Sequence, residues 1–362
     1  MRLESAEAFP IRLKAEEKLR GGTFTYTHYQ TVLVKAVCDG VAGWGEAMTR
    51  QEPKATALLV SHLADEFIGT DVVRPSSVWE RIWKVLRVRG HTRGTDVEAL
   101  SGLDIALHDC QARLAGKPLN RLLSSRVSET VTAYAGSLFE SRGSLEDQVE
   151  AVMAAGLAGA KVKVGFGPSK DAQILKKVRK MMDDRMLVAD ANGAYDLARA
   201  RKACVLFRDL RLAWFEEPLL SDDWEGYAKL GAHNPVPIGA GESWFAGDFD
   251  ETIRRGLVRV LEPSVSRCGG VGTELMLGKL AARRKLGFSP MTGMNSAISL
   301  AASLHVASST PSLGVEYNPF PNPLQTELAT GLPQPKSGRL AVPPGPGIGI
   351  EVDESFVRRN VV

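Results

Sequence analysis

At 362 residues, with 44% hydrophobic and 24% charged side chains, the chain has the composition of a soluble globular protein with a large core. Its formal net charge of +3 comes from scattered residues, with no basic block to predict nucleic-acid binding and no long apolar run or leader to predict membrane insertion or export. Four widely spaced cysteines without a CxxC pair predict reduced, cytoplasmic thiols.

The first 125 residues are predicted to form a separate α+β domain. Asp39-Gly40 lies between two strand patterns and is a strong β-hairpin signal. Residues 19–28 (LRGGTFTYTH) are rich in Gly and Thr and predict a mobile loop. Strand patterns and then helical patterns, an order typical of a domain of its own, occur at 1–13, 31–38, 41–45, 53–67, 75–88 and 96–114.

From residue 126 to 330, short apolar runs of strand type alternate with amphipathic stretches of helical type. Eight such strand–helix units predict a closed (β/α)₈ barrel. After residue 331 the chain is rich in Pro and Gly, and we expect residues 331–362 to pack back on the first domain. The strand patterns lie at 131–136, 160–164, 258–264, 286–291 and 313–317, and in the three runs that end at Asp190, Glu216 and Glu242.

Acidic residues end three successive strand patterns. The distances from Asp190 to Glu216 and from Glu216 to Glu242 are both 26 residues, and Asp190 lies 27 residues after Lys163, as expected for one strand plus one helix. Because the carboxyl ends of parallel barrel strands share one mouth, these side chains should converge there. Singly, each could be a solvated loop residue. Together they would repel one another without a divalent cation, and their hard oxygen ligands suit Mg²⁺.

Lys161 and Lys163 alternate along one strand and should therefore both face the barrel interior. Two neighbouring ammonium groups close to a dication would lower each other's pKa. That effect would let Lys163 act as a base near pH 7.

Several sequence motifs together resemble those of the enolase superfamily, and within it those of the mandelate racemase-like branch. They are GWGEA at 43–47, GLDIALHDCQARLAGKPLNRLL at 102–123, KVK at 161–163, the acids in VADANG, EEP and GES, and PPGPGIG in the tail. The resemblance implies a modified TIM barrel with an N-terminal capping domain, and a homo-oligomer. It also implies that Mg²⁺ is held by Asp190, Glu216 and Glu242, and that a proton α to the carboxylate of a small molecule is abstracted through an enediolate.

The resemblance also assigns roles. It makes Lys163 the base, Lys161 the residue that tunes the base and contacts the substrate carboxylate, and Glu316 an acid hydrogen-bonded to that carboxylate. The chain departs from the branch at the His–Asp dyad of its racemases, where Ser264 and Met294 stand instead. A single lysine base favours dehydration of an acid sugar.

Alternatives to dehydration remain open at the level of sequence. One is a cycloisomerase or a racemase or epimerase acting on a carboxylate substrate. Another, from a different class, is a metal-binding, non-catalytic sensor protein.

Residues that bind the substrate are predicted from their position in the chain. Substrate choice should depend on residues 19–28, on residues 48–53 and on the barrel loops, whose shapes the sequence does not fix. His28 could assist a leaving group, although a histidine in a polar loop is more often a plain surface residue. Arg267 could anchor substrate or simply form a surface ion pair. Trp244 and Asn295 are expected, by position alone, to line the remaining wall.

Overall fold

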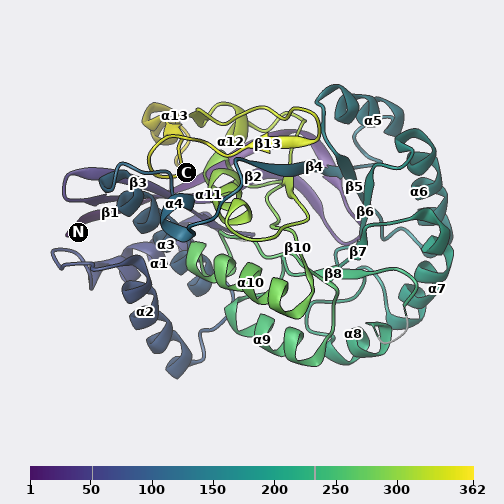
Figure 1. Cartoon of the computed structure of the whole chain (residues 1–362), viewed down its shortest axis with the longest axis horizontal. Coiled ribbons are helices and arrows are strands. Elements are labelled where there is room, and N and C mark those ends of the chain that lie inside the picture. The colour runs from purple at the N-terminus through teal and green to yellow at the C-terminus, as the bar shows by residue number, and fades with distance from the viewer. Residues whose placement is uncertain (51, 232–233) are drawn as a thin grey trace.

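The computed structural model describes residues 1–50, 52–231 and 234–362 and contains a parallel β-barrel surrounded by helices (Figure 1). The described barrel strands follow the order β10-β9-β8-β7-β6-β5-β4-β11. The ring closes where the amide of Leu313, two residues before β11, donates a 2.8 Å hydrogen bond to the Phe288 carbonyl of β10. The predicted (β/α)₈ barrel is confirmed. Its strands are β4 (Thr130–Leu138), β5 (Gly159–Lys163), β6 (Met186–Asp190), β7 (Trp214–Glu216), β8 (Ile238–Ala240), β9 (Val260–Leu261), β10 (Gly287–Phe288) and β11 (Val315–Tyr317).

The helices of the barrel lie on its outer surface, as the (β/α)₈ arrangement requires (Figure 1). Where the structure describes the chain, no helix has the length and apolar character needed to cross a membrane. These helices are α5 (Leu145–Ala154), α6 (Pro168–Met182), α7 (Leu197–Phe207) with the 3₁₀ turn η1 (Arg208–Leu210), α8 (Trp224–Gly231), α9 (Ala246–Arg255), α10 (Val271–Arg284) and α11 (Ala297–Ser308).

The N-terminal unit, which we call the cap, is an antiparallel sheet of order β1-β2-β3 covered by helices. Its β2–β3 turn lies at Asp39 and Gly40, which both have positive φ angles (47° and 75°), as the predicted hairpin requires. The cap elements are β1 (Leu3–Arg20), β2 (Thr25–Cys38), β3 (Val41–Met48), α1 (Pro53–Asp65), α2 (Pro75–Arg89), α3 (Thr95–Leu114) and the short α4 (Asn120–Leu123).

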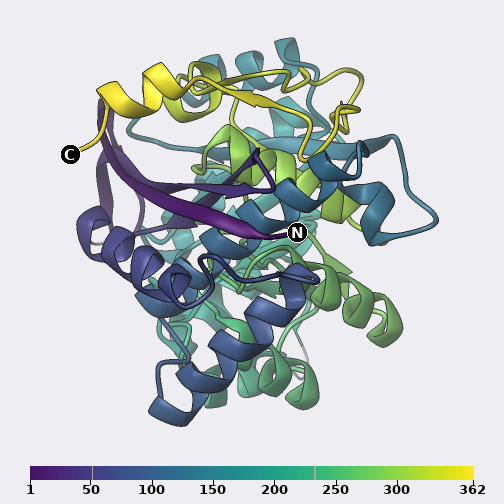
Figure 2. The ribbon, with the colours of Figure 1, turned by 90° about the vertical axis from the view of Figure 1, so that its left-hand side faces the viewer.

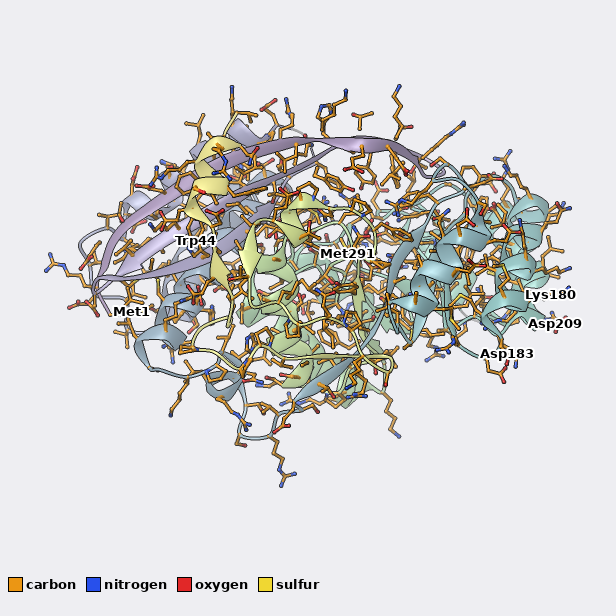
Figure 3. The ribbon with its side chains drawn as sticks, turned by 90° about the horizontal axis from the view of Figure 1, so that it is seen from above. Met1, Trp44, Lys180, Asp183, Asp209 and Met291 are labelled. Carbon is orange, nitrogen blue, oxygen red and sulfur yellow. The ribbon has the colours of Figure 1, made fainter. Side chains whose placement is uncertain are left out.

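The expectation of a mobile loop over residues 19–28 was wrong. Leu19 pairs with Tyr26 and Arg20 pairs with Thr25, so only residues 21–24 form the turn between β1 and β2. The Thr and Tyr residues of this segment favour strands, and that preference outweighs the two glycines. The resulting long hairpin runs from the cap across to the barrel (Figure 3).

The cap sheet and α3 approach each other closely through glycines. A Cβ atom added at Gly45 would lie 2.0 Å from the Gly102 carbonyl oxygen, so both positions exclude any larger side chain. Nearby, the Trp44 amide donates a 2.8 Å hydrogen bond to Asp109 on α3. The GWG and GLD motifs of the sequence therefore form one tightly packed contact between the cap sheet and α3.

The C-terminal segment contacts both the cap and the barrel. The Ile348 amide donates a 2.8 Å hydrogen bond to Asp109 of α3, and Lys35 forms a 2.6 Å ion pair with Glu354. Figure 2 shows this segment (yellow) beside the β1–β2 hairpin (purple). Its elements are α12 (Pro323–Thr326), β12 (Ala329–Thr330), β13 (Arg339–Ala341), which pairs with β4, β14 (Glu351–Val352) and α13 (Glu354–Arg359).

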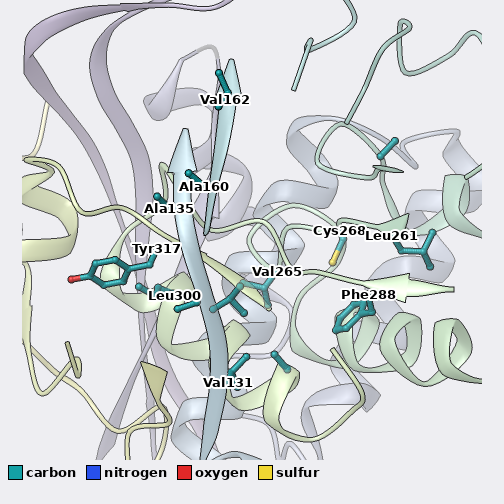
Figure 4. Packing of buried hydrophobic residues seen from close by; sticks show 14 of the residues in the cluster. Val131, Ala135, Ala160, Val162, Leu261, Val265, Cys268, Phe288, Leu300 and Tyr317 are labelled. Carbon is teal, nitrogen blue, oxygen red and sulfur yellow. The ribbon is translucent and has the colours of Figure 1, made fainter. Parts of the chain in front are cut away.

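Apolar side chains fill the space between the barrel strands and their helices, including Val131, Ala160 and Val162 (Figure 4). A smaller cluster of buried residues contains Tyr134 and Trp214, whose rings meet edge to face at 5.8 Å. Val188 of the same cluster pairs in register with both Lys161 and Trp214. Because paired residues of parallel strands share a face of the sheet, this cluster fills the barrel interior beside the lysine.

Candidate active site

Six charged side chains gather at the C-terminal ends of the barrel strands, and all of them are almost completely buried. Adjacent strands bring them together, because β5, β6, β7 and β8 are consecutive neighbours in the sheet. The register places Lys163 beside Asp190 and Asp190 beside Glu216. The six are Lys161 and Lys163 on β5, Asp190 at the end of β6, Glu216 at the end of β7, Glu242 two residues after β8, and Glu316 on β11.

Lys161 lies among three carboxylates. Its Nζ is 3.0 Å from an oxygen of Glu216 and 3.4 Å from Asp190 Oδ2, and it forms a further ion pair with Glu316. The second oxygen of Glu316 accepts a 2.8 Å hydrogen bond from the Gly293 amide. Charges this deeply buried are stable only when they are paired, and this network pairs them.

Lys163 contacts a different set of groups. Its Nζ lies 2.5 Å from Asp190 Oδ2 and donates a 2.8 Å hydrogen bond to Asn192 Oδ1. Asn192 in turn donates from its side-chain amide to Glu242 Oε1 at 2.9 Å. Its φ of 44° lies in the left-handed region, which asparagine tolerates better than most residues. Asn192 therefore connects the lysine to the third carboxylate.

The expected lowering of the lysine pKa is not found in this arrangement of side chains. Burial lowers the pKa of Lys163, but Asp190 together with Glu242 and Glu216 outweighs burial, and the net pKa lies above its ordinary value. The same balance, with Glu216 as the main partner, raises the pKa of Lys161. The predicted lowering included a divalent cation beside the lysines, and it stays a prediction.

The carboxyl groups differ from one another in pKa. Burial, with the negative charge of Asp190 next, raises the pKa of Glu216 well above its ordinary value. Burial also raises the pKa of Glu242, but Arg50 and the two lysines outweigh it and lower the pKa to about 2. Glu217, which follows Glu216, has a pKa raised to about 7 by burial and by Glu242.

A cavity of about 440 Å³ opens above these groups, between the strand ends and the cap. His28 and Asn295 border this cavity, as expected. Trp244 does not, and its predicted place in the wall was wrong. Its ring packs between Trp224 and Phe249, because an indole contributes more by apolar burial than by exposure.

Arg267 also lies outside the cavity with the lysines. Its guanidinium stacks over the Phe245 ring at 4.7 Å, and its Nε lies 3.5 Å from Glu98 of the cap. The expectation that Arg267 anchors substrate in the lysine cavity is therefore not met by its position. Of residues 48–53, Met48, Thr49 and Arg50 border the lysine cavity, and residue 51 lies outside the described residues.

Neutral side chains surround Ser264 and Met294, the two positions where the resemblance implies a His–Asp dyad in racemases. Asn295 donates to the hydroxyl groups of Ser264 (3.3 Å) and Ser266 (3.1 Å). Met294 borders the cavity, as does Met291 (labelled in Figure 3). None of these side chains exchanges a proton near neutral pH, so this wall offers no second acid or base.

The oxygens of the three strand-end acids are paired with cationic side chains in this structure. Within residues 1–50, 52–231 and 234–362, no three carboxylate, imidazole or thiol groups converge closely enough to hold an ion. The two lysines and Arg50 occupy the oxygens of Asp190, Glu216 and Glu242 instead. Among those residues the buried Glu216 Oε2 has no hydrogen-bond partner, and its polar contact is the 3.0 Å ion pair with Lys161 Nζ. The oxygen donors fit Mg²⁺ in chemistry, and binding requires the cationic side chains to move away from them.

Two family models match the chain. Residues 16–124 match the mandelate racemase / muconate lactonizing enzyme N-terminal domain, and residues 144–356 match the enolase C-terminal domain-like family. The chain belongs to the enolase superfamily. The resemblance inferred from its motifs is confirmed, and with it the prediction of an enzyme.

Relatives of this enolase-superfamily chain cover almost its whole length. A D-galactarolactone cycloisomerase from Agrobacterium fabrum is 28% identical over 98% of this chain and 97% of its own. A D-galactonate dehydratase from Xanthomonas axonopodis pv. citri is 26% identical over 89% of this chain and 88% of its own. The crystal structure of a mandelate racemase/muconate lactonizing enzyme-like protein from Rubrobacter xylanophilus has a TM-score of 0.88 at 28% identity, with both chains fully covered.

Sequence reasoning missed three residues of this enolase-superfamily site. Asn192 lies in the VADANG motif, where the Asn-Gly pair predicts a turn. At this turn the Asn192 side chain points toward Lys163. Glu217 follows Glu216 in the EEP phrase. Arg50 is separated from its partner Glu242 by 192 residues and gives no local signal.

Proposed function

We propose that this protein is a Mg²⁺-dependent lyase that dehydrates an acid sugar. The proposal rests on the position of Lys163, which is buried at the cavity beside Asp190. Elsewhere in the barrel mouth lies the neutral group of Asn295, Ser264 and Ser266. A base at Lys163 together with a neutral wall at Asn295, Ser264 and Ser266 favours chemistry in which the same group removes and returns a proton. The dehydratase among the relatives supports this choice.

Each residue of the site has a role in the proposed reaction. Lys163 takes the proton from the carbon α to the substrate carboxylate, while Lys161 and Glu316 hold that carboxylate. The β carbon–oxygen bond then breaks, and the leaving hydroxyl takes the proton from Lys163 and departs as water. The enol that remains becomes a 2-keto acid. Held by Asp190, Glu216 and Glu242, Mg²⁺ would supply positive charge next to the carboxylate and lower the pKa of Lys163.

A library of aldonates and aldarates, incubated with protein and Mg²⁺, tests the proposal through the appearance of 2-keto acids. Product from at least one member is expected. Its absence across the whole library would count against dehydration. Reactions lacking enzyme, and reactions with chelator in place of Mg²⁺, are the controls.

A cycloisomerase is the second candidate, and one relative of 28% identity is a cycloisomerase. Such a reaction also needs only one proton-transfer group at the α carbon, so the neutral wall at Asn295 suits it equally. Mass spectrometry of the product formed in D₂O separates the two reactions. Deuterium at the α carbon without loss of water supports the cycloisomerase.

Several further predictions stay proposals. The division into residues 1–125, 126–330 and 331–362 is supported by the contacts of the last segment with Asp109 and Lys35 of the cap. All four cysteines are free and buried, which suits the proposed cytoplasmic location. A homo-oligomer is proposed from family membership.

A further inference from the structure

The two walls of the active-site cavity differ in charge. The barrel wall carries the lysines and carboxylates described above. The cap wall carries no acid among the described residues that border the cavity, and it is rich in hydroxyl groups. Four of these come from Thr23, Thr25, Thr27 and Thr49. Hydroxyls both donate and accept hydrogen bonds, so this wall matches the hydroxyl groups along a sugar chain.

Arg50 is the one described cap residue at the cavity with a permanent charge. It lies two residues after the end of β3, where the Met48 amide donates a 2.9 Å hydrogen bond to the Ser266 carbonyl of a barrel loop. This bond fixes the end of β3 against the barrel. The Arg50 side chain is consequently held at the cavity, with 35% of it still exposed.

The guanidinium of Arg50 has unused hydrogen-bonding capacity. Its Nη2 donates to Glu242 Oε1 at 2.9 Å, and Glu242 is its only hydrogen-bond partner among the residues that the structure describes. A guanidinium has five N–H donors. The same Glu242 oxygen also accepts from Asn192 at 2.9 Å, so it keeps a donor when Arg50 turns toward a ligand.

These features favour an anion at the cap end of the substrate. A guanidinium binds a carboxylate through two parallel hydrogen bonds, which a neutral terminal hydroxymethyl group does not offer. We propose that Arg50 binds the second carboxylate of a sugar diacid, with the threonine wall contacting the hydroxyls between the two ends. Arg50 thereby determines a preference for aldarates over aldonates. This inference rests on the proposed function, since Lys161 and Glu316 are taken to hold the first carboxylate.

Matched substrate pairs test the inference. Each pair is an aldonate and the aldarate of the same configuration, assayed for kcat/KM with the parent protein, Arg50→Ala and Arg50→Lys. The parent should prefer the aldarate. Arg50→Ala should lower the ratio of kcat/KM on the aldarate to kcat/KM on the aldonate by on the order of 100-fold, because only the aldarate loses a charge partner. Arg50→Lys should recover part of the loss, since an ammonium provides charge without the two-pronged geometry.

Arg12→Ala is the matched control. Arg12 is also a cap residue with a side chain 35% exposed and one ion pair, to Glu52 at 3.1 Å, but it does not border the cavity. Its removal should leave the ratio between the two substrates unchanged. Equal losses on both substrates in Arg50→Ala would mean that Arg50 serves only to neutralise Glu242, and would overturn the inference. So would a parent protein that prefers the aldonates.

A binding measurement separates failure of the inference from failure of the proposed function. Calorimetry on the Lys163→Ala protein measures the affinity for each acid without turnover. In that background, Arg50→Ala should weaken aldarate binding much more than aldonate binding. If no acid of either class is turned over by the parent, the dehydratase proposal fails, while this result still decides the role of Arg50. Aldarate binding that does not depend on Arg50 overturns the inference.

Discussion

Replacing Glu46 with alanine should destabilise the protein strongly, because this buried carboxylate joins the cap to the barrel. Glu46 lies on β3 and is 1% exposed. Its oxygens accept hydrogen bonds from the Ser296 amide (3.1 Å) and hydroxyl (2.7 Å) and from the Ser299 amide (3.3 Å), at the N-terminus of α11. It also accepts a 2.9 Å bond from the Thr31 hydroxyl. The carboxylate therefore caps a buried barrel helix from another part of the chain.

The expected loss follows from the buried hydrogen-bond donors that no longer have an acceptor in the variant. Thr31 keeps a second acceptor in the Ala47 carbonyl at 3.1 Å, so its hydroxyl loses little. The buried amides of Ser296 and Ser299 lose a charged acceptor. Each amide left without an acceptor reduces the free energy of unfolding by about 1–3 kcal/mol. With the lost interaction between the negative charge and the helix N-terminus, Glu46→Ala should reduce the free energy of unfolding by about 3–5 kcal/mol. That is a large share of the roughly 5–15 kcal/mol that holds a typical protein folded.

Urea unfolding followed by circular dichroism measures the loss. The midpoint should fall while the slope with denaturant stays constant, because the surface exposed on unfolding is unchanged. Glu46→Gln keeps an acceptor oxygen and should lose less. Glu7→Ala is the control, since Glu7 is an exposed acid with one ion pair, to Arg358 at 3.7 Å, and its loss should stay within about 0.5 kcal/mol. A loss below about 1 kcal/mol in Glu46→Ala would refute the reasoning.

Two further predictions concern stability. Burial raises the pKa of Glu274 from 4.5 to about 8, so the folded state holds its proton more tightly than the unfolded state and stability falls as pH rises from about 5 to 8. Glu274→Gln keeps an uncharged hydrogen-bond partner for Ser303 and should become progressively more stable than the parent over that range. In urea titrations the difference in the free energy of unfolding should reach on the order of 4 kcal/mol at pH 8. A difference that does not change with pH would contradict this. Gly45→Ala should prevent close packing against Gly102 and lose about 2 kcal/mol or more, whereas Gly272→Ala, in open space on α10, should gain about 0.5–1 kcal/mol. Equal thermal midpoints for these two variants would contradict the packing argument.

The barrel was predictable because its signal repeats. Apolar runs ending in Asp190, Glu216 and Glu242 recur at one interval, and each repeat is a local strand–helix unit. Which acids share the barrel mouth follows from topology alone, so their proximity could be anticipated. The extent of the β1–β2 hairpin could not, because residues 19–28 combine turn-forming glycines with strand-forming Thr and Tyr.

The contacts between the cap and the site could not be predicted from the sequence. Arg50 reaches Glu242 across 192 residues, and no periodic pattern encodes a contact between two domains. Trp244 was placed in the cavity wall from its position after Glu242, yet it packs into an aromatic cluster. The raised pKa of Lys163 depends on a 2.5 Å contact with Asp190, and such distances are set by packing rather than by spacing.

The most direct test of the central claim is the rate of α-proton removal in the parent protein and in Lys163→Ala. The measurement follows loss of the α C–H signal of a sugar acid in D₂O by proton NMR. If Lys163 is the base, the variant should lose on the order of 10³-fold or more in this rate while it still binds the acid. A variant that retains the parental rate within about tenfold would contradict the assignment of Lys163 as the base.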